Sequence, residues 1–265
     1  MKRNGTMAPH DLEIPAWQHA AQEIIKTWRA CEAAGGQCST WWGTLDDKHI
    51  PETIQNKGAD YKKPAWWPED IDLHIPWFTL WEYCYVLTQA DLFEAKELNL
   101  LSLGGAASAL DLTCLLLGHR LTVLDARTYG VERQMANAIK LGCSSRLTVH
   151  PGMRIEHLGE LTEVYDGMIS SNVIFLAGGF AQTACRLDLS AKIQPGGFAC
   201  FTVDIANSNP LRFVDPASVE RRFSWNGFAR EGDGWSDNGL RYHVYYPDPT
   251  KPRYTAGGLF LRRLP

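Results

Sequence analysis

From Leu98 onward, short strand-like segments alternate with longer helix-like segments, and this alternation constrains the fold more than any other feature of the sequence. The strand-like segments are apolar, and each connection between them is long enough to hold a helix. This order is typical of a mostly parallel sheet with helices on its faces. The predicted strands are 99–103, 121–124, 146–149, 167–170 and 198–203, and the predicted helices are 109–117, 129–141 and 182–193.

The C-terminal part adds two alternating segments, 241–246 and 258–263, on either side of a proline-rich stretch. Their alternation of apolar and polar residues predicts an antiparallel pair. Together, the segments predict an α/β fold with a seven-stranded, mostly parallel, doubly wound sheet.

The N-terminal part has a different character, since eight of the ten tryptophans lie within the first 81 residues. Residues 12–34 and 77–90 are predicted to be helices, and Trp17 and Trp28 share the apolar face of the first. The stretch 37–76 contains several prolines and little periodicity, which is typical of a lid or binding loop. We therefore expect residues 1–96 to form a helical and loop cap, and residues 97–265 to form the cofactor-binding domain.

Composition excludes several classes of function. The 265-residue chain carries 26 basic and 30 acidic residues, a net charge of −4, so no overall positive field attracts nucleic acid or anionic lipid. No apolar run is long enough to span a membrane, and no secretory signal is recognisable. The seven cysteines include no C-x-x-C pair. We expect a cytoplasmic protein with reduced thiols, without a metal site, a nucleic-acid partner or a membrane partner, and leave its oligomeric state open.

A small-residue turn, Gly104-Gly105-Ala106-Ala107-Ser108, joins the first predicted strand of the α/β part to a helix. Small residues let a ligand approach the backbone, and the helix N-terminus offers unpaired N–H groups. Asp125 follows the next strand about twenty residues later, where a carboxylate can accept both hydroxyls of a ribose. The pattern favours a nucleoside cofactor.

Four segments resemble class I S-adenosylmethionine-dependent methyltransferases. Ser102–Ser108 lines up with the acid-x-Gly-x-Gly-x-Gly turn of that family, and Tyr165–Ile174 is similar to its fourth strand. Gln194–Gly197 looks like the Pro-Gly-Gly turn before strand five, and Trp81-Glu82-Tyr83 is similar to a helix in members with small-molecule substrates. The resemblance covers residues 77–205. It implies S-adenosyl-L-methionine as cofactor, a small-molecule acceptor and the strand order 3-2-1-4-5-7-6.

The chain departs from the family pattern in three places. Ser102 replaces the usual acid, which in the family helps to hold the amino group of the methionine moiety, and Ala106 and Ser108 replace glycines. We expect Glu82 and Ser171 to substitute for the missing acid. Phe175-Leu176 replaces a frequent Glu-His pair and so removes one candidate base.

The resemblance implies a set of site residues. The expected general bases are His150, His243 and Glu82. Adjacent aromatic residues in a loop cannot all face one core, so Trp41, Trp42, Trp66 and Trp67 are expected to contact the substrate. The cofactor is expected to contact Glu82, Tyr83, Gly104, Gly105, Ala106, Asp125, Ala126, Gly152, Met153, Ser170, Ser171 and Asn172.

Two other functions remain open. Gly104-x-Ala106-x-x-Ala109 with Asp125 approximates the dinucleotide fingerprint of NAD-dependent oxidoreductases, although Ala106 obstructs the position where the pyrophosphate sits. The missing acid is also compatible with a non-catalytic cofactor-binding or partner protein on a methyltransferase scaffold.

Overall fold

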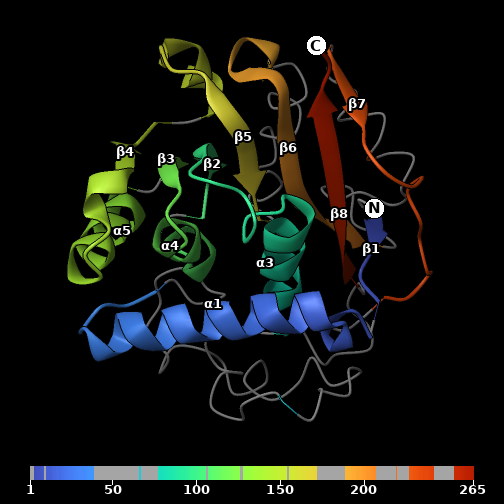
Figure 1. Cartoon of the computed structure of the whole chain (residues 1–265), viewed down its shortest axis with the longest axis horizontal. Coiled ribbons are helices and arrows are strands. Elements are labelled where there is room, and N and C mark those ends of the chain that lie inside the picture. Colours follow the sequence, from blue (N-terminus) through green and yellow to red (C-terminus); the bar gives the residue numbers. More distant parts are fainter. Residues whose placement is uncertain are drawn as a thin grey trace.

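An eight-stranded sheet organises the computed structural model of the chain (Figure 1). The strand order is β1-β8-β6-β5-β2-β3-β4, and β7 also pairs with β8. The structure describes residues 3–8, 10–38, 66, 77–105, 107–125, 128–153, 155–171, 189–206, 219, 227–241 and 254–265. The strands are β1 (Gly5–Thr6), β2 (Asn99–Leu103), β3 (Arg120–Asp125), β4 (Leu147–Pro151), β5 (Tyr165–Ser170), β6 (Ile193–Ala206), β7 (Phe228–Arg230) and β8 (Tyr254–Arg263).

The centre of the sheet is parallel, and one side of it is antiparallel. β4, β3, β2, β5 and β6 run parallel to their neighbours, whereas β8 runs antiparallel to β6, β1 and β7. The predicted α/β class is therefore confirmed. The predicted order is confirmed from the strand at Leu147–Pro151 through to the final antiparallel strand.

The far edge of β8 differs from the prediction. β1 and β7 pair with it there, and neither was predicted as a strand. The predicted strand at 241–246 falls outside the described residues except for Arg241, which is not in a strand. β8 also begins at Tyr254 rather than at 258.

The predicted helix at 182–193 is wrong at its end, and its earlier part lies outside the described residues. Leu189–Ala191 is a single 3₁₀ turn (η6), and Ile193 already belongs to β6, where it is the partner of Tyr165. Pairing with Tyr165 gives Ile193 a place in the sheet, and Pro195 drives the preceding Gln194 away from helical backbone angles.

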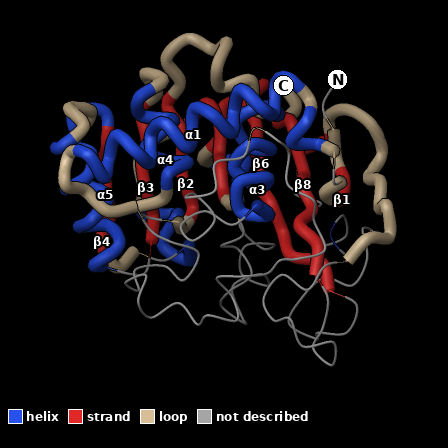
Figure 2. Tube along the Cα trace, turned by 90° about the horizontal axis from the view of Figure 1, so that it is seen from below, coloured by secondary structure: helices blue, strands red, loops and turns tan. Residues whose placement is uncertain are grey.

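Four α-helices cover the sheet within the described residues. They are α1 (Pro15–Ala33), α3 (Trp77–Gln89), α4 (Ala109–Leu116) and α5 (Thr128–Lys140). α1 is preceded by a 3₁₀ turn, η1 (Asp11–Glu13), and two further turns, η4 (Ser144–Arg146) and η5 (Ile155–Glu160), flank β4. In Figure 1, α1 lies below α3 and α4, at the end of the sheet toward which β5 points. Figure 2 shows β4 and α5 at one edge of the molecule and β1 at the other.

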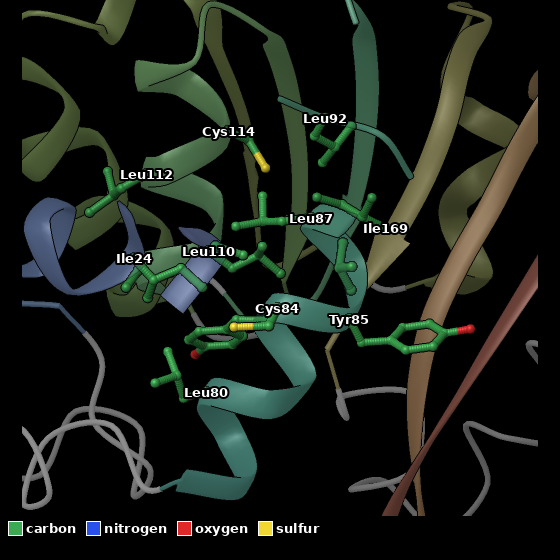
Figure 3. Packing of buried hydrophobic residues seen from close by; sticks show 14 of the residues in the cluster. Ile24, Leu80, Cys84, Tyr85, Leu87, Leu92, Leu110, Leu112, Cys114 and Ile169 are labelled. Atoms are coloured by element: carbon green, nitrogen blue, oxygen red, sulfur yellow. The ribbon is translucent and has the colours of Figure 1, made fainter. Parts of the chain in front are cut away.

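Two hydrophobic clusters lie on opposite faces of the sheet. Leu100 belongs to the cluster that includes α1, α3 and α4, whereas Leu101 belongs to the other cluster, because successive side chains of a strand point to opposite faces. Figure 3 shows Leu87 of α3 beside Leu110 of α4, with Tyr85 pointing away from them toward the antiparallel strands. Trp17 packs against Trp81 with ring centroids 5.3 Å apart, so the predicted apolar face of α1 is confirmed.

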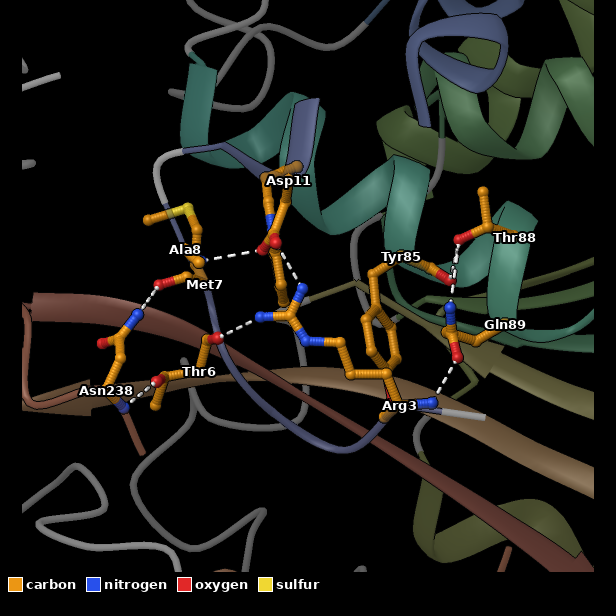
Figure 4. Close-up of polar contacts among 10 residues, drawn as sticks. Arg3, Thr6, Met7, Ala8, Asp11, Tyr85, Thr88, Gln89 and Asn238 are labelled. Atoms are coloured by element: carbon orange, nitrogen blue, oxygen red, sulfur yellow. Dashed lines mark hydrogen bonds and ion pairs between the residues drawn. The ribbon is translucent and has the colours of Figure 1, made fainter. Parts of the chain in front are cut away.

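The N-terminal segment is held against α3 by polar contacts (Figure 4). The hydroxyl of Tyr85 donates to the carbonyl of Arg3 at 2.7 Å, and the amide of Arg3 donates to Oε1 of Gln89 at 2.6 Å. The buried Asp11 forms an ion pair with Arg3 and accepts from Nε1 of Trp81 at 2.7 Å. One hydrophobic cluster contains Trp17 and Trp81 of the predicted cap together with Leu100 of the sheet, so the described residues of the cap share a core with the sheet.

Two further observations concern the described part of the chain alone. None of its helices is long and apolar enough to cross a membrane. Its six cysteines are thiols and form no disulfide bond.

Candidate functional site

The strand order changes direction next to β2, and this point defines the candidate site. The chain runs outward from β2 to β3 and β4, and then returns to place β5 on the other side of β2. In open α/β sheets, ligands bind beyond the carboxyl ends of the strands at such a switch point. Here those ends are Leu103, Asp125, Pro151 and Ser170.

The turn after β2 has the backbone conformation that its small residues predict. Gly104 and Gly105 both have φ 72°, and Ala107 has φ 67°. The amide of Gly104 donates to the carbonyl of Leu124 at 2.7 Å, which fixes the turn to the end of β3. Left-handed backbone costs a non-glycine residue roughly 1–2 kcal/mol, so Ala107 is held in this conformation by its surroundings.

Ser108 has a structural reason to replace a glycine. It is the N-cap of α4, with φ −71°, and its side chain accepts a hydrogen bond from the amide of Asp111 at 3.1 Å. A serine cap satisfies one of the N–H groups that a helix leaves unpaired at its start. Ser108 therefore caps the helix that follows the turn.

Asp125 and the residues after β4 lie together. Asp125 ends β3, is buried, and stands opposite Pro151 in the parallel pairing. Gly152 follows with φ 72°. Met153 is half-buried and packs against the hydrophobic cluster that contains Leu101. The structure thus brings Gly104, Gly105, Asp125, Gly152 and Met153 to neighbouring strand ends, whereas Ala106, Ala126 and Asn172 lie outside the described residues.

Ser170 ends β5, and its hydroxyl forms a hydrogen bond to the neighbouring strand β2. Its Oγ donates to the carbonyl of Leu103 at 2.9 Å, and the residue is buried. Ser171, the next residue, is half-buried. Ser170 therefore ties the end of β5 to the start of the glycine turn.

Glu82 and Tyr83 lie in α3, and both are buried. Oε1 of Glu82 accepts a hydrogen bond from Oγ1 of Thr202 at 3.2 Å. Thr202 belongs to β6, which is two strands from β2 in the sheet, about 10 Å at the usual strand spacing. The structure therefore places Glu82 beside β6, and its expected replacement of the acid missing at Ser102 stays a prediction.

The carboxyl group that contacts Ser102 belongs to Asp111 of α4, a residue not predicted for the site. Oγ of Ser102 donates to Oδ1 of Asp111 at 2.9 Å, and both residues are buried. Burial raises the pKa of the Asp111 carboxyl to about 8, the Ser102 hydrogen bond opposes this shift, and the charge of Asp125 adds to it. The signal in the sequence was an aspartate inside an apolar helical run, three residues after a capping serine.

The remaining predicted residues are only partly described. His150 is half-buried in β4, opposite Leu124 of β3. Trp66 is half-buried and packs against the hydrophobic cluster that includes α1, α3 and α4. His243, Trp41, Trp42 and Trp67 lie outside the described residues.

The described residues suit S-adenosylmethionine, a cationic nucleoside without phosphate. Asp111 has a second carboxyl oxygen, Oδ2, that is buried and has no hydrogen-bond partner among the described residues. A buried acceptor of this kind is stabilised by a cationic or hydrogen-bonding group. The glycine turn and Asp125 would supply the close backbone approach and the ribose acceptor. Within the described ranges, no three side chains form a cluster suited to a metal ion.

Comparison of the sequence finds no family model and no curated protein that matches the chain. Comparison of the fold finds a protein from Galdieria sulphuraria provisionally assigned as a sarcosine dimethylglycine methyltransferase. The likeness has a TM-score of 0.52 at 12% identity and covers 70% of this chain and 85% of that one. The chain therefore has the fold of class I methyltransferases.

Two further solved structures are similar at lower scores. TrmN from Thermus thermophilus gives a TM-score of 0.48 at 16% identity, covering 69% of this chain and 48% of that one. The N-methyltransferase NodS from Bradyrhizobium japonicum WM9 gives 0.45 at 15% identity, covering 68% and 90%. The matched part of this chain thus spans about half the length of TrmN.

Proposed function

We propose that the chain is an S-adenosylmethionine-dependent methyltransferase that acts on a small molecule with a hydroxyl or amine group. The observation that carries the proposal is the meeting of the left-handed turn at Gly104 and Gly105 with the buried Asp125. The two lie at neighbouring strand ends, joined by the hydrogen bond from Gly104 to Leu124. The fold is one that methyltransferases use, which supports the same conclusion.

Each part of this edge has a role in holding the cofactor. Gly104 and Gly105 would let the nucleoside approach the backbone, and the carboxylate of Asp125 would accept hydrogen bonds from the two ribose hydroxyls. Gly152 and Met153 would border the nucleoside next to Asp125. When bound, S-adenosylmethionine supplies a methyl group that its sulfonium has already activated.

The chain's own contribution to catalysis would be alignment of the acceptor and removal of a proton from it. His150 is the described candidate base nearest the cofactor edge, since it stands at the end of β4 beside Leu124. His243 and Glu82 are the other candidates. Trp41, Trp42, Trp66 and Trp67 would form apolar walls for the acceptor, and we expect the reaction to take place in the cytoplasm.

The first test is calorimetric titration of the protein with S-adenosylhomocysteine and with NAD. We expect S-adenosylhomocysteine to bind and NAD not to bind. Asp125→Ala should weaken S-adenosylhomocysteine at least tenfold, because it removes one or two charge-assisted hydrogen bonds of about 1.5–3 kcal/mol each. Asp233→Ala, at an exposed position, is the matched control and should leave affinity unchanged.

The same titration separates the alternatives. Preference for NAD would favour an oxidoreductase, and unchanged affinity in Asp125→Ala would remove the main support for the proposed site. S-adenosylhomocysteine binding without methyl transfer from S-adenosylmethionine to any of a panel of hydroxyl and amine acceptors would favour a non-catalytic binding protein.

A further inference from the structure

Asp111 is fixed from two sides, at its carboxyl group and at its backbone amide. Its Oδ1 accepts a hydrogen bond from Oγ of Ser102 at 2.9 Å, and its own backbone amide donates to Oγ of Ser108 at 3.1 Å. The first contact comes from the end of β2, and the second comes from the N-cap of α4. The carboxyl is therefore held between the strand and the helix that the glycine turn connects.

The other oxygen of this carboxyl is left over. Oδ2 is buried and has no hydrogen-bond partner within the described part of the chain, and the whole residue is only 1% exposed. The titratable groups that interact with the carboxyl are Asp125 of β3 and Cys114 of α4, both of them acids. No described cation compensates it, and burial raises its pKa to about 8. Burying a carboxyl in this way is costly, so a positively charged ligand group would stabilise the site.

Position 102 is where the class I turn usually carries its acid. A serine there is too short to reach a ligand in the manner of an aspartate or glutamate. Its hydroxyl instead holds the Asp111 carboxyl within hydrogen-bond distance of the same strand end. An acid from the helix thus lies beside the position where the strand lacks one.

We propose that Asp111 performs the role of the missing turn acid, and that its Oδ2 accepts a hydrogen bond from the ammonium group at the amino-acid end of the cofactor. This inference rests on the proposed function. It makes Asp111 a cofactor-binding residue and Ser102 the residue that positions it.

The test compares two ligands that differ in the amino-acid end. S-adenosylhomocysteine carries the ammonium group, and 5′-methylthioadenosine lacks it. Asp111→Asn, an isosteric change, should weaken S-adenosylhomocysteine at least tenfold and change the affinity for methylthioadenosine less than twofold. Ser102→Ala keeps the carboxyl but removes its anchor, so it should weaken S-adenosylhomocysteine three- to tenfold and also spare methylthioadenosine.

A second measurement follows the proton that the Asp111 carboxyl holds in the free protein. Since the ammonium group favours the ionised carboxylate, the wild-type protein should release up to one proton when it binds S-adenosylhomocysteine at pH 7. Titrations in phosphate and in Tris, which have different ionisation heats, report this release. Asp111→Asn should abolish it, whereas Asp233→Asn, at an exposed position, should leave it in place.

Two results would overturn the inference while leaving the proposed function intact. One is wild-type affinity for S-adenosylhomocysteine in Asp111→Asn. The other is equal weakening of both ligands, which would mean that Asp111 only shapes the turn. If the wild-type protein binds neither ligand, the proposed function fails and this inference fails with it.

Discussion

At the scale of the residue, the buried Asp111 makes the stability of the free protein depend on pH. Its pKa is about 8 in the folded protein, above the ordinary value of 3.8 expected in the unfolded chain. Between these values the folded state holds a proton that the unfolded state has lost. The resulting stabilisation is complete below about pH 4 and is lost as the pH rises toward 8, by at most ~1.4 kcal/mol per pH unit.

We therefore expect the free energy of unfolding of the wild-type protein, relative to Asp111→Asn, to fall by up to about 3 kcal/mol between pH 5 and pH 7.5. Urea unfolding of both proteins at the two pH values measures this difference. Other titrating groups act on both proteins alike, so the comparison isolates position 111. A difference that stays constant with pH would mean that the carboxyl titrates normally.

At the scale of the element, the contact between α3 and β8 depends on a glycine. A Cβ atom added to Gly258 would lie 2.3 Å from the ring of Tyr85, which is completely buried. Gly258→Ala should thus force α3 from the sheet and cost about 1–3 kcal/mol. Gly159→Ala is the control, since a Cβ there meets nothing within 4 Å. Thermal unfolding should separate the two variants, and equal melting temperatures would show that α3 adjusts freely.

At the scale of the whole molecule, we expect the tryptophans of the N-terminal part to fall into two groups. Trp17 is buried against Trp81 and Tyr85, so Trp17→Ala should cost about 3–5 kcal/mol of stability. Trp42→Ala and Trp67→Ala should instead impair turnover and change cofactor affinity less than threefold, if the stretch 37–76 acts as a lid. Melting temperature, cofactor binding and turnover distinguish the groups. Loop variants that melt as early as Trp17→Ala would contradict the lid.

The sequence by itself determined the local elements and the parallel centre of the sheet. Apolar strands such as 99–103, small residues in the turn and the apolar face of α1 act over a few neighbouring residues, so their effect is visible in the pattern. Asp125 was predictable for the same reason, because its place at a strand end follows from spacing along the chain.

Only the tertiary structure decided which distant residues meet. Gly5–Thr6 joins β8 although about 250 residues separate them, and no local pattern marks so short an edge strand. The acidic residue that lies beside Ser102 is a similar case. Glu82 matched a family motif, yet its helix packs over β6, whereas Asp111 reaches Ser102 because α4 folds back onto β2. Side-chain proximity of this kind depends on how helices pack against the sheet, which the order of residues alone does not specify.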